Sequence, residues 1–292
     1  MINQKTLKKR FEVTGVGIHS GKPVSMSIQP APVNTGLIFR CAGVEIPALS
    51  EYVGDTRFCT TLIKQGTQLS MVEHVLSAMM GLGIDNALIE VSASEVPIMD
   101  GSAYPLVQLI MNIGLEEQSM PKQFLKIIEP IEVRDGNKWA KIEPYDGFSV
   151  SFEGEYTHPA IPRSEQKYHI ELSTTAQYIS EVSRARTFGF LADLEYLRSK
   201  NLALGGSLEN AVVLDDIKVL NPEGMRYSNE PMRHKVLDAI GDLCLLGHPV
   251  LGAFSAYSSG HTLNDALVRK ILDTPVAWEK VTKKETAASL EF

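Results

Sequence analysis

Residues 233–243 read RHKVLDAIGDL and predict a helix that carries polar groups along one side. His234, Asp238 and Asp242 recur at intervals of four residues. Residues four apart lie on nearly the same face of an α-helix, about 6 Å apart along its axis, so one small cation can reach both His234 and Asp238. Burying such a face costs free energy unless a cation neutralises the carboxylates, so a buried helix here favours a divalent metal ion. The apolar positions of this segment are Val236, Leu237, Ile240 and Leu243.

The same segment has a simpler interpretation. Histidine, lysine and aspartate at helical spacing most often form a solvated face, which pairs of opposite charge four residues apart stabilise. Histidine and aspartate are also ordinary residues of exposed helix surfaces. This segment alone leaves both the metal site and the solvated face open, and other stretches must decide between them.

The length and composition describe a globular chain. The 292 residues suit two domains, and 44% hydrophobic with 22% charged residues is typical of soluble proteins. The formal net charge of -7 argues against a nucleic-acid-binding protein, because such proteins usually present a basic surface to the phosphates. We therefore expect no nucleic-acid partner.

The cysteines and the N-terminal segment bear on the cellular compartment. The three cysteines, Cys41, Cys59 and Cys244, lack C-x-x-C spacing, and their odd number predicts no disulfide framework. Residues 1–10 are basic, but no apolar segment of a signal peptide follows them. No run in the chain approaches the ~18 apolar residues of a membrane span. We expect a cytoplasmic protein without a membrane-spanning segment.

A second helix start carries further candidate residues. Residues 70–81 read SMVEHVLSAMMG, in which Ser70 and Glu73 have the spacing of a capping box. Glu73 could therefore serve only to cap the helix. His74 falls in the first turn, where the positive end of the helix favours the neutral imidazole that a metal ion requires. The position of His74 thus suits a metal ligand.

The remaining patterns predict an α+β fold. In the first half, we expect strands at residues 24–29, 36–40, 58–64 and 83–95, and helices at 70–81 and 104–111. In the second half, we expect strands at 125–133, 138–144, 148–156, 168–172, 202–215 and 251–257, and helices at 176–182, 191–199, 233–243 and 264–272. The polar stretch 116–123 is the best linker candidate. We predict two similar domains, residues 1–120 and 121–292, each a β-sheet layered with α-helices.

Several separated motifs support a family resemblance. They are GVGIHSG (15–21), SMVEH (70–74), DGS (100–102), SRARTF (183–188), RHKVLDAIGD (233–242) and SGHTLN (259–264). With these motifs the chain resembles, from about residue 7 to about residue 281, the zinc-dependent UDP-3-O-acyl-N-acetylglucosamine deacetylases. Motifs in the right order are far more specific together than any one alone. The resemblance implies hydrolysis of the 2-acetamido group of an acylated UDP-N-acetylglucosamine, which releases acetate in the committed step of lipid A synthesis.

The resemblance implies a metal site between the two predicted domains. His74, His234 and Asp238 would bind one Zn²⁺ per chain, with Fe²⁺ as the alternative ion. Three protein ligands leave a coordination position for water, as catalytic zinc requires. Residues 1–120 would contribute Glu73, His74 and His19, and residues 121–292 would contribute His234, Asp238, His261 and a passage for the acyl chain.

The resemblance also implies the catalytic roles. Glu73 corresponds to the general base that accepts the proton of the attacking water. His261 corresponds to the general acid that protonates the leaving amine, while Asp242 orients its imidazole and favours its charged form. Thr187 corresponds to a hydroxyl that donates to the tetrahedral oxyanion, a contact typically worth about 3 kcal/mol in the transition state.

Substrate-binding positions follow from the same resemblance. Lys138, Glu155 and Tyr156 match the nucleotide end, where the aromatic ring would stack on uracil. Lys235 would meet anionic groups or sugar hydroxyls, and His19 lies in the glycine-rich motif. The acyl passage would be lined by Phe188, Leu191, Leu194, Ala203, Ser207 and Val213. Burying each methylene of the acyl chain there would contribute about 0.8 kcal/mol to substrate binding, so this passage should determine which acyl length is preferred.

The implied partner is a small-molecule substrate, acylated UDP-N-acetylglucosamine. We expect a monomer that makes at most transient contact with the inner-membrane surface. Two rival interpretations stay open: a zinc hydrolase of another N-acyl sugar or small amide, and a binding module whose metal ion only joins two domains. A structural zinc site would be closed by a fourth ligand, unlike a catalytic one. The H-E-x-x-H motif is absent, which disfavours a zincin protease.

Overall fold

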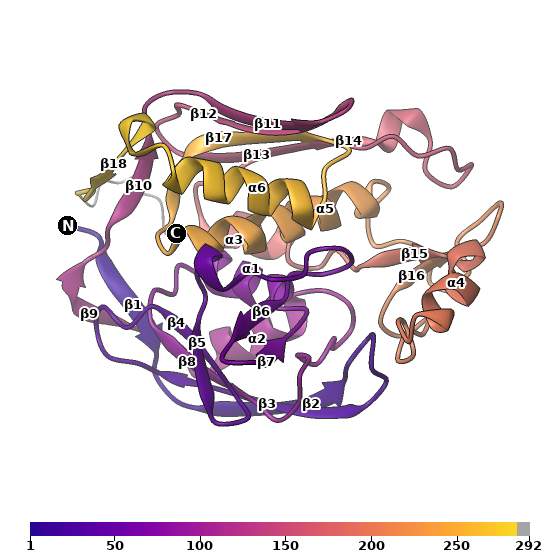
Figure 1. The fold of residues 1–292 in the computed structure, drawn as a ribbon, viewed down its shortest axis with the longest axis horizontal. Coiled ribbons are helices and arrows are strands. Elements are labelled where there is room, and N and C mark those ends of the chain that lie inside the picture. The colour runs from indigo at the N-terminus through magenta and orange to yellow at the C-terminus, as the bar shows by residue number, and fades with distance from the viewer. Residues whose placement is uncertain (285–292) are drawn as a thin grey trace.

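The structure is a computed structural model that describes residues 1–284, and these residues form two main β-sheets with helices packed between them (Figure 1). The sheet of the first half lies at the bottom of Figure 1 and the larger sheet of the second half lies at the top. The helices of each half cover the inner face of their own sheet. The predicted α+β class, in which sheets are layered with helices, is confirmed.

The first sheet has five strands. Its order is β2 (Phe11–Val16), β3 (Pro23–Pro30), β8 (Ala87–Val91), β4 (Leu37–Cys41) and β5 (Val44–Pro47). Only the pairing of β4 with β8 is parallel. The helices α1 (Glu73–Gly81) and α2 (Tyr104–Ile113) lie on its inner face. A short hairpin of β6 (Leu62–Lys64) and β7 (Thr67–Leu69) precedes α1.

The second sheet has seven strands arranged around β17 (Val250–Tyr257). Its path runs β11 (Ile131–Asp135), β12 (Lys138–Glu143), β17, β10 (Phe124–Ile127) and β18 (Trp278–Val281). On its other side β17 pairs in parallel with β13 (Phe148–Glu153), which carries β14 (Lys167–Glu171). This half also contains the helices α3 (Thr175–Glu181), α5 (Glu230–Leu243) and α6 (His261–Leu272).

Helix α5 lies between the two layers and is buried on almost every side. Of its residues, only Arg233 and Lys235 are more than slightly accessible to solvent. His234, Asp238 and Asp242 are 2%, 3% and 1% exposed. The solvated-face interpretation of residues 233–243 is therefore wrong, and the buried polar face is confirmed.

A two-stranded sheet links the N-terminal strand to the stretch predicted as a linker. β1 (Asn3–Leu7) pairs antiparallel with β9 (Leu115–Pro121). The polar side chains of β9 are used as hydrogen-bond partners, since Glu117 accepts from Asn3 and Gln118 accepts from Asn86. The polar stretch is thus a strand rather than an irregular segment, while the domain boundary near residue 120 stays a prediction.

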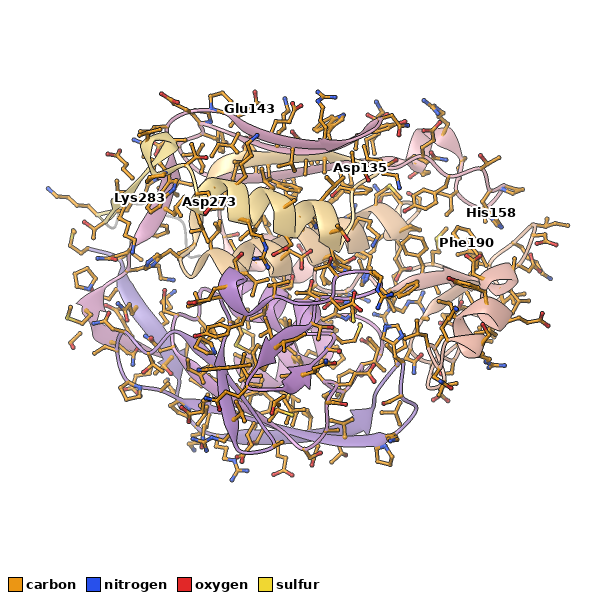
Figure 2. The ribbon with its side chains drawn as sticks, in the orientation of Figure 1. Asp135, Glu143, His158, Phe190, Asp273 and Lys283 are labelled. Atoms are coloured by element: carbon orange, nitrogen blue, oxygen red, sulfur yellow. The ribbon has the colours of Figure 1, made fainter. Side chains whose placement is uncertain are left out.

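A smaller unit projects at the right of Figure 1. The parallel strands β15 (Phe188–Phe190) and β16 (Val212–Leu214) form its base, and α4 (Leu194–Ser199) lies in the connection between them. Figure 2 shows Phe190 beside His158 at this edge, and their ring centroids lie 5.6 Å apart. We call residues 188–214 the projecting unit.

Several predicted boundaries differ from the structure. The helix expected at residue 70 begins at Glu73, because the backbone turns at Met71 with φ of 66° and directs Ser70 to a bond with Ser94. No capping box forms there, so that prediction is wrong. The last helix begins at His261, three residues before the predicted start. The strands expected at 58–64, 83–95 and 202–215 shorten to β6, β8 and β16, and the helix expected at 191–199 shortens to α4.

Candidate metal centre

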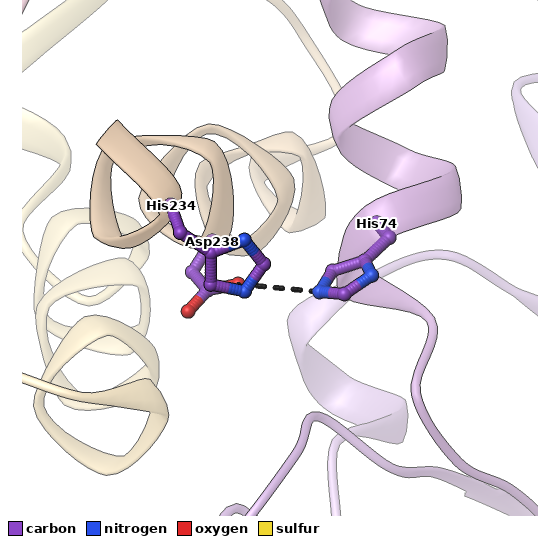
Figure 3. Close-up of side chains that lie close together, drawn as sticks. All are labelled: His74, His234 and Asp238. Carbon is purple, nitrogen blue, oxygen red and sulfur yellow. Dashed lines mark ion pairs between the residues drawn. The ribbon is translucent and has the colours of Figure 1, made fainter. Parts of the chain in front are cut away.

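Two histidines and one aspartate from distant parts of the chain converge between α1 and α5 (Figure 3). Their candidate ligand atoms all lie within 4.8 Å of one another, and all three residues are buried. Asp238 Oδ1 lies 3.6 Å from Nε2 of His74 and 3.3 Å from Nε2 of His234. The two imidazole rings meet edge to face, with centroids 4.9 Å apart. The grouping expected for a single ion is therefore present.

A close helix crossing brings the three residues together. A Cβ atom on Gly241 would lie 2.0 Å from the carbonyl oxygen of Glu73, so the α5 backbone touches the first turn of α1. His74 follows Glu73 on α1, and Asp238 precedes Gly241 by three residues on α5. Glycine at position 241 therefore sets the distance between His74 and the ligands of α5.

The hydrogen bonds of His234 favour a metal-binding imidazole. Its Nδ1 lies 3.0 Å from the carbonyl oxygen of Ala185, and that oxygen can only accept, so we place the proton on Nδ1. Burial lowers the pKa of His234 to about 3, which keeps the ring neutral. The lone pair of Nε2 then faces Asp238. This carbonyl-to-histidine bond is the kind that orients ligands in metal sites.

Asp238 has one satisfied and one unsatisfied oxygen. Its Oδ2 accepts from Nζ of Lys235 at 2.8 Å, whereas Oδ1 is buried without a partner among the described residues. Burial alone would raise the pKa of Asp238, but the neighbouring ammonium of Lys235 opposes this, and the pKa lies well below the usual range. A buried, charged oxygen without a donor is costly unless a cation binds it. Two imidazole nitrogens and one carboxylate oxygen suit a divalent transition-metal ion such as Zn²⁺ or Fe²⁺.

A second buried cluster lies against the first. His261 Nδ1 lies 2.9 Å from Asp242 Oδ2, and His261 Nε2 lies 3.6 Å from Glu73 Oε1. Burial raises the pKa of Glu73, although the nearby histidines oppose this shift. Burial would lower the pKa of His261, but Asp242 and Glu73 outweigh it and raise the pKa to about 9. The cluster therefore pairs a carboxyl group with a histidine that holds its proton at neutral pH.

Two members of this cluster were missed by sequence reasoning. Thr60 donates its hydroxyl to Asp242 Oδ1 at 2.6 Å, and its backbone N–H donates to Glu73 Oε2 at 3.0 Å. Asn264 donates to Asp242 Oδ2 at 2.9 Å. A helix beginning at His261 would have placed Asn264 on the same face, so spacing could have indicated it. No local pattern distinguishes Thr60 from its neighbours.

Thr187 is held by backbone bonds from both halves of the chain. Its N–H donates to the carbonyl of Gly101 at 2.8 Å, and its carbonyl accepts from the N–H of Val212 at 2.8 Å. It follows Ala185, the acceptor for His234, by two residues. The structure therefore places Thr187 on the segment that also contacts a candidate ligand.

The residues predicted for substrate binding fall into separate groups. Phe188 lies beside both Lys235, whose Nζ is 5.8 Å from the ring centroid, and Tyr156, whose ring centroid is 5.7 Å away. These three residues are brought together next to Asp238. Glu155 lies farther along and accepts from the hydroxyl of Tyr257.

Lys138 begins β12 at the end of the larger sheet where Tyr257 ends β17. Its side chain is exposed. Because Tyr257 bonds Glu155, Lys138 and Glu155 lie toward the same end of this sheet. No described contact joins Lys138 to the candidate metal centre.

The residues predicted for the acyl passage all belong to the projecting unit. They are Phe188, Leu191, Leu194, Ala203, Ser207 and Val213. Leu191 is 45% exposed and Ser207 is also exposed. His19 reaches this unit from the first half, because its Nδ1 accepts from the N–H of Ala203 at 3.4 Å. His19 Nε2 is buried without a partner in the described part of the chain.

A cavity of about 350 Å³ lies elsewhere, between the two halves beside the C-terminal ends of α1 and α5. Its walls include Met80, Lys122 and Cys244. None of the predicted site residues lines this cavity. The candidate site is therefore defined by the side-chain clusters and not by this cavity.

Comparisons with known proteins agree with the motifs. A family model described as UDP-3-O-acyl N-acetylglycosamine deacetylase matches residues 4–273. The chain is 52% identical over 298 residues to the UDP-3-O-acyl-N-acetylglucosamine deacetylase of Shewanella oneidensis, covering 100% of this chain and 97% of the relative. It is 51% identical, with the same coverage, to the protein of that name from Shewanella baltica. Within residues 1–284, no helix combines the length and apolar character needed to cross a bilayer.

Proposed function

The chain belongs to the UDP-3-O-acyl N-acetylglycosamine deacetylase family, and from this we propose that it hydrolyses the 2-acetamido group of UDP-3-O-acyl-N-acetylglucosamine. The products would be acetate and the free 2-amine, in the committed step of lipid A synthesis. The observation that carries the proposal is the convergence of His74, His234 and Asp238, with Asp238 Oδ1 buried and unpaired. A hydrolase that uses a metal-activated water needs such a site beside an acid and a base.

We propose that these three residues hold one Zn²⁺, with Fe²⁺ as the alternative. When bound, such an ion activates water and polarises the amide carbonyl. Three protein ligands leave a coordination position free, and no fourth histidine, cysteine or acidic residue joins the group within the described residues. This supports a catalytic ion over one that only joins two domains.

Glu73 and His261 are the proposed base and acid. Glu73 is buried beside the candidate ligands, and its Oε2 is held by Thr60, so Oε1, which lies 3.6 Å from His261 Nε2, would take the proton of the attacking water. His261 carries its proton at neutral pH because Asp242 and Glu73 raise its pKa. It would deliver this proton from Nε2 to the leaving nitrogen, while Asp242 holds Nδ1. The hydroxyl of the water joins the acetyl carbon, the C–N bond breaks as the nitrogen gains the proton from His261, and the proton taken by Glu73 is released when the enzyme resets after acetate and the amine leave.

Thr187 and Lys235 are the proposed contacts to the reacting group and the sugar nucleotide. The backbone of Thr187 is pinned on both sides, and its hydroxyl would donate to the oxyanion that develops on the acetyl carbonyl. Lys235 is charged, since Asp238 raises the pKa of its ammonium against the effect of burial. It lies between Asp238 and the ring of Phe188, where it would meet anionic or hydroxyl groups of the substrate.

The two ends of the substrate would contact two groups of residues, which meet where Tyr156 packs against Phe188. We propose that Lys138, Glu155 and Tyr156 meet the nucleotide, and that the projecting unit together with His19 receives the acyl chain. The apolar side chains of that unit, such as Phe188, Leu194 and Val213, support this assignment, since acyl methylenes gain about 0.8 kcal/mol each on burial. The division into residues 1–120 and 121–292, monomeric action, cytoplasmic location and transient membrane contact stay predictions.

The test measures metal content together with acetate release from UDP-3-O-acyl-N-acetylglucosamine. We expect about one zinc ion per wild-type chain and turnover that a chelator abolishes. Glu73→Ala should keep the zinc and lose turnover, because the base and not a ligand is removed. Unchanged turnover in Glu73→Ala would remove the mechanism. Release of acetate from UDP-N-acetylglucosamine without an acyl chain, at the same rate, would favour a general N-acyl sugar hydrolase.

A further inference from the structure

Thr60 contacts both partners of the proposed acid–base pair. It lies just before β6 and is 1% exposed. Its backbone N–H donates to Glu73 Oε2 at 3.0 Å, and its hydroxyl donates to Asp242 Oδ1 at 2.6 Å. One residue of the first half thus bonds the base directly and the acid through Asp242.

These bonds restrict how Asp242 can hold His261. The hydroxyl of Thr60 occupies Asp242 Oδ1, and the amide of Asn264 donates to Oδ2 at 2.9 Å. Ser259 in turn donates to the amide oxygen of Asn264 at 2.7 Å, which fixes the amide orientation. A carboxylate held at both oxygens cannot rotate without breaking a buried bond. Asp242 Oδ2 therefore stays 2.9 Å from His261 Nδ1.

The position of Asp242 determines the direction in which Nε2 of the His261 ring points. With Nδ1 held by Asp242 and also 3.3 Å from the hydroxyl of Thr60, His261 Nε2 lies 3.6 Å from Glu73 Oε1. Glu73 is itself held by the backbone of Thr60. Thr60 thus helps to fix the distance between Glu73 and His261, because it bonds Glu73 through its backbone and holds His261 through Asp242.

We propose that Thr60 is a positioning residue, which keeps Glu73 and His261 at the separation that proton transfer through one bound substrate requires. The inference rests on the proposed deacetylase function. Thr60 touches neither the substrate nor the candidate metal ligands in this scheme. It acts on the rate only through Glu73 and through Asp242 and His261.

A merely structural role makes a different prediction. If the Thr60 hydroxyl only provided a hydrogen bond to Asp242 that stabilises the fold, its loss would lower the rate by the same factor whether or not His261 is present. A positioning role requires that the effect on kcat depends on His261. The neighbouring Thr61 offers a matched control, because it is also buried but bonds Ser70 and not Asp242.

The experiment compares kcat and KM of zinc-loaded full-length protein for Thr60→Val, Thr60→Ala and Thr60→Ser, each with and without His261→Ala. We expect Thr60→Val and Thr60→Ala to lower kcat about 10- to 100-fold, with KM changed less than about three-fold. Thr60→Ser, which keeps the hydroxyl, should recover most of kcat, and Thr61→Val should match the wild type. In the His261→Ala background, the Thr60 changes should lower the residual rate less than about two-fold.

The outcomes separate this inference from the proposed function. Failure of the wild type to release acetate would reject the deacetylase proposal itself. The positioning role would be rejected if the wild type turns over normally but the Thr60 changes lower kcat by the same factor with and without His261. It would also be rejected if Thr61→Val lowers kcat as much as Thr60→Val. Thr60→Ala leaves room for water beside Asp242, so it decides the question where Thr60→Val does not fold.

Discussion

Adding one methyl group at Gly241 should separate the two helices that carry the candidate metal ligands. A Cβ there would lie 2.0 Å from the carbonyl oxygen of Glu73, about 1.4 Å inside the 3.4 Å at which ordinary contact begins. The obstructing atoms are backbone, so α1 and α5 must move apart. Such overpacking destabilises the fold by about 3 kcal/mol, and the higher helix propensity of alanine relative to glycine offsets about 1 kcal/mol of this. We expect Gly241→Ala to lower the free energy of unfolding by about 2 kcal/mol.

The effect on metal binding should be larger than the effect on stability. His74 lies on α1, whereas His234 and Asp238 lie on α5. Metal–ligand distances tolerate only about 0.2 Å, so a displacement near 1 Å should weaken zinc affinity at least ten-fold. Zinc affinity is measured by competition with a chromophoric chelator, and stability by urea unfolding of metal-free protein.

Gly189→Ala is the control for this experiment, because its Cβ would enter open space. It should bind zinc like the wild type. If Gly241→Ala also binds zinc with wild-type affinity, the helix crossing does not set the ligand geometry, and our account of the site is wrong.

Three further predictions concern the same centre. The pKa of His261 is raised from 6.5 to about 9, so protonation of His261 should stabilise the metal-free fold by about 3 kcal/mol. This stabilisation is complete below pH 6.5 and is lost as the pH rises through 9, which urea unfolding across this range should show. In His261→Gln the free energy of unfolding should depend less on pH. Chelation of the metal should lower the melting temperature of the wild type but not that of Asp238→Ala. A bound metal ion present at about 100 times its Kd adds about 2.7 kcal/mol to the free energy of unfolding. An equal drop in melting temperature in both proteins would mean that the ion binds elsewhere. Thr187→Val should lower kcat about 100-fold with little change in KM, whereas Thr187→Ser should retain activity; a change confined to KM would contradict the oxyanion role.

Local sequence patterns predicted the helix that carries two of the candidate metal ligands, but not all of the residues around it. The four-residue spacing of His234, Asp238 and Asp242 is a property of helix geometry, so it could be read without a fold. The motifs that carry the family resemblance predicted which distant residues join them. The start of α1 was misplaced, because the positive φ of Met71 is set by the strand contacts around Ser70 and overrides the capping-box pattern.

The sequence by itself determined that a polar helix face exists, that His74 begins another helix, and that these features match a metal-dependent deacetylase family. Only the tertiary structure decided that the face is buried, that Gly241 lets α1 touch α5, and that Thr60 bonds both Glu73 and Asp242. The physical reason is the range of the interactions. Helical periodicity acts over a few residues, whereas the bond from Thr60 to Asp242 joins residues 182 positions apart, whose meeting depends on the packing of both layers.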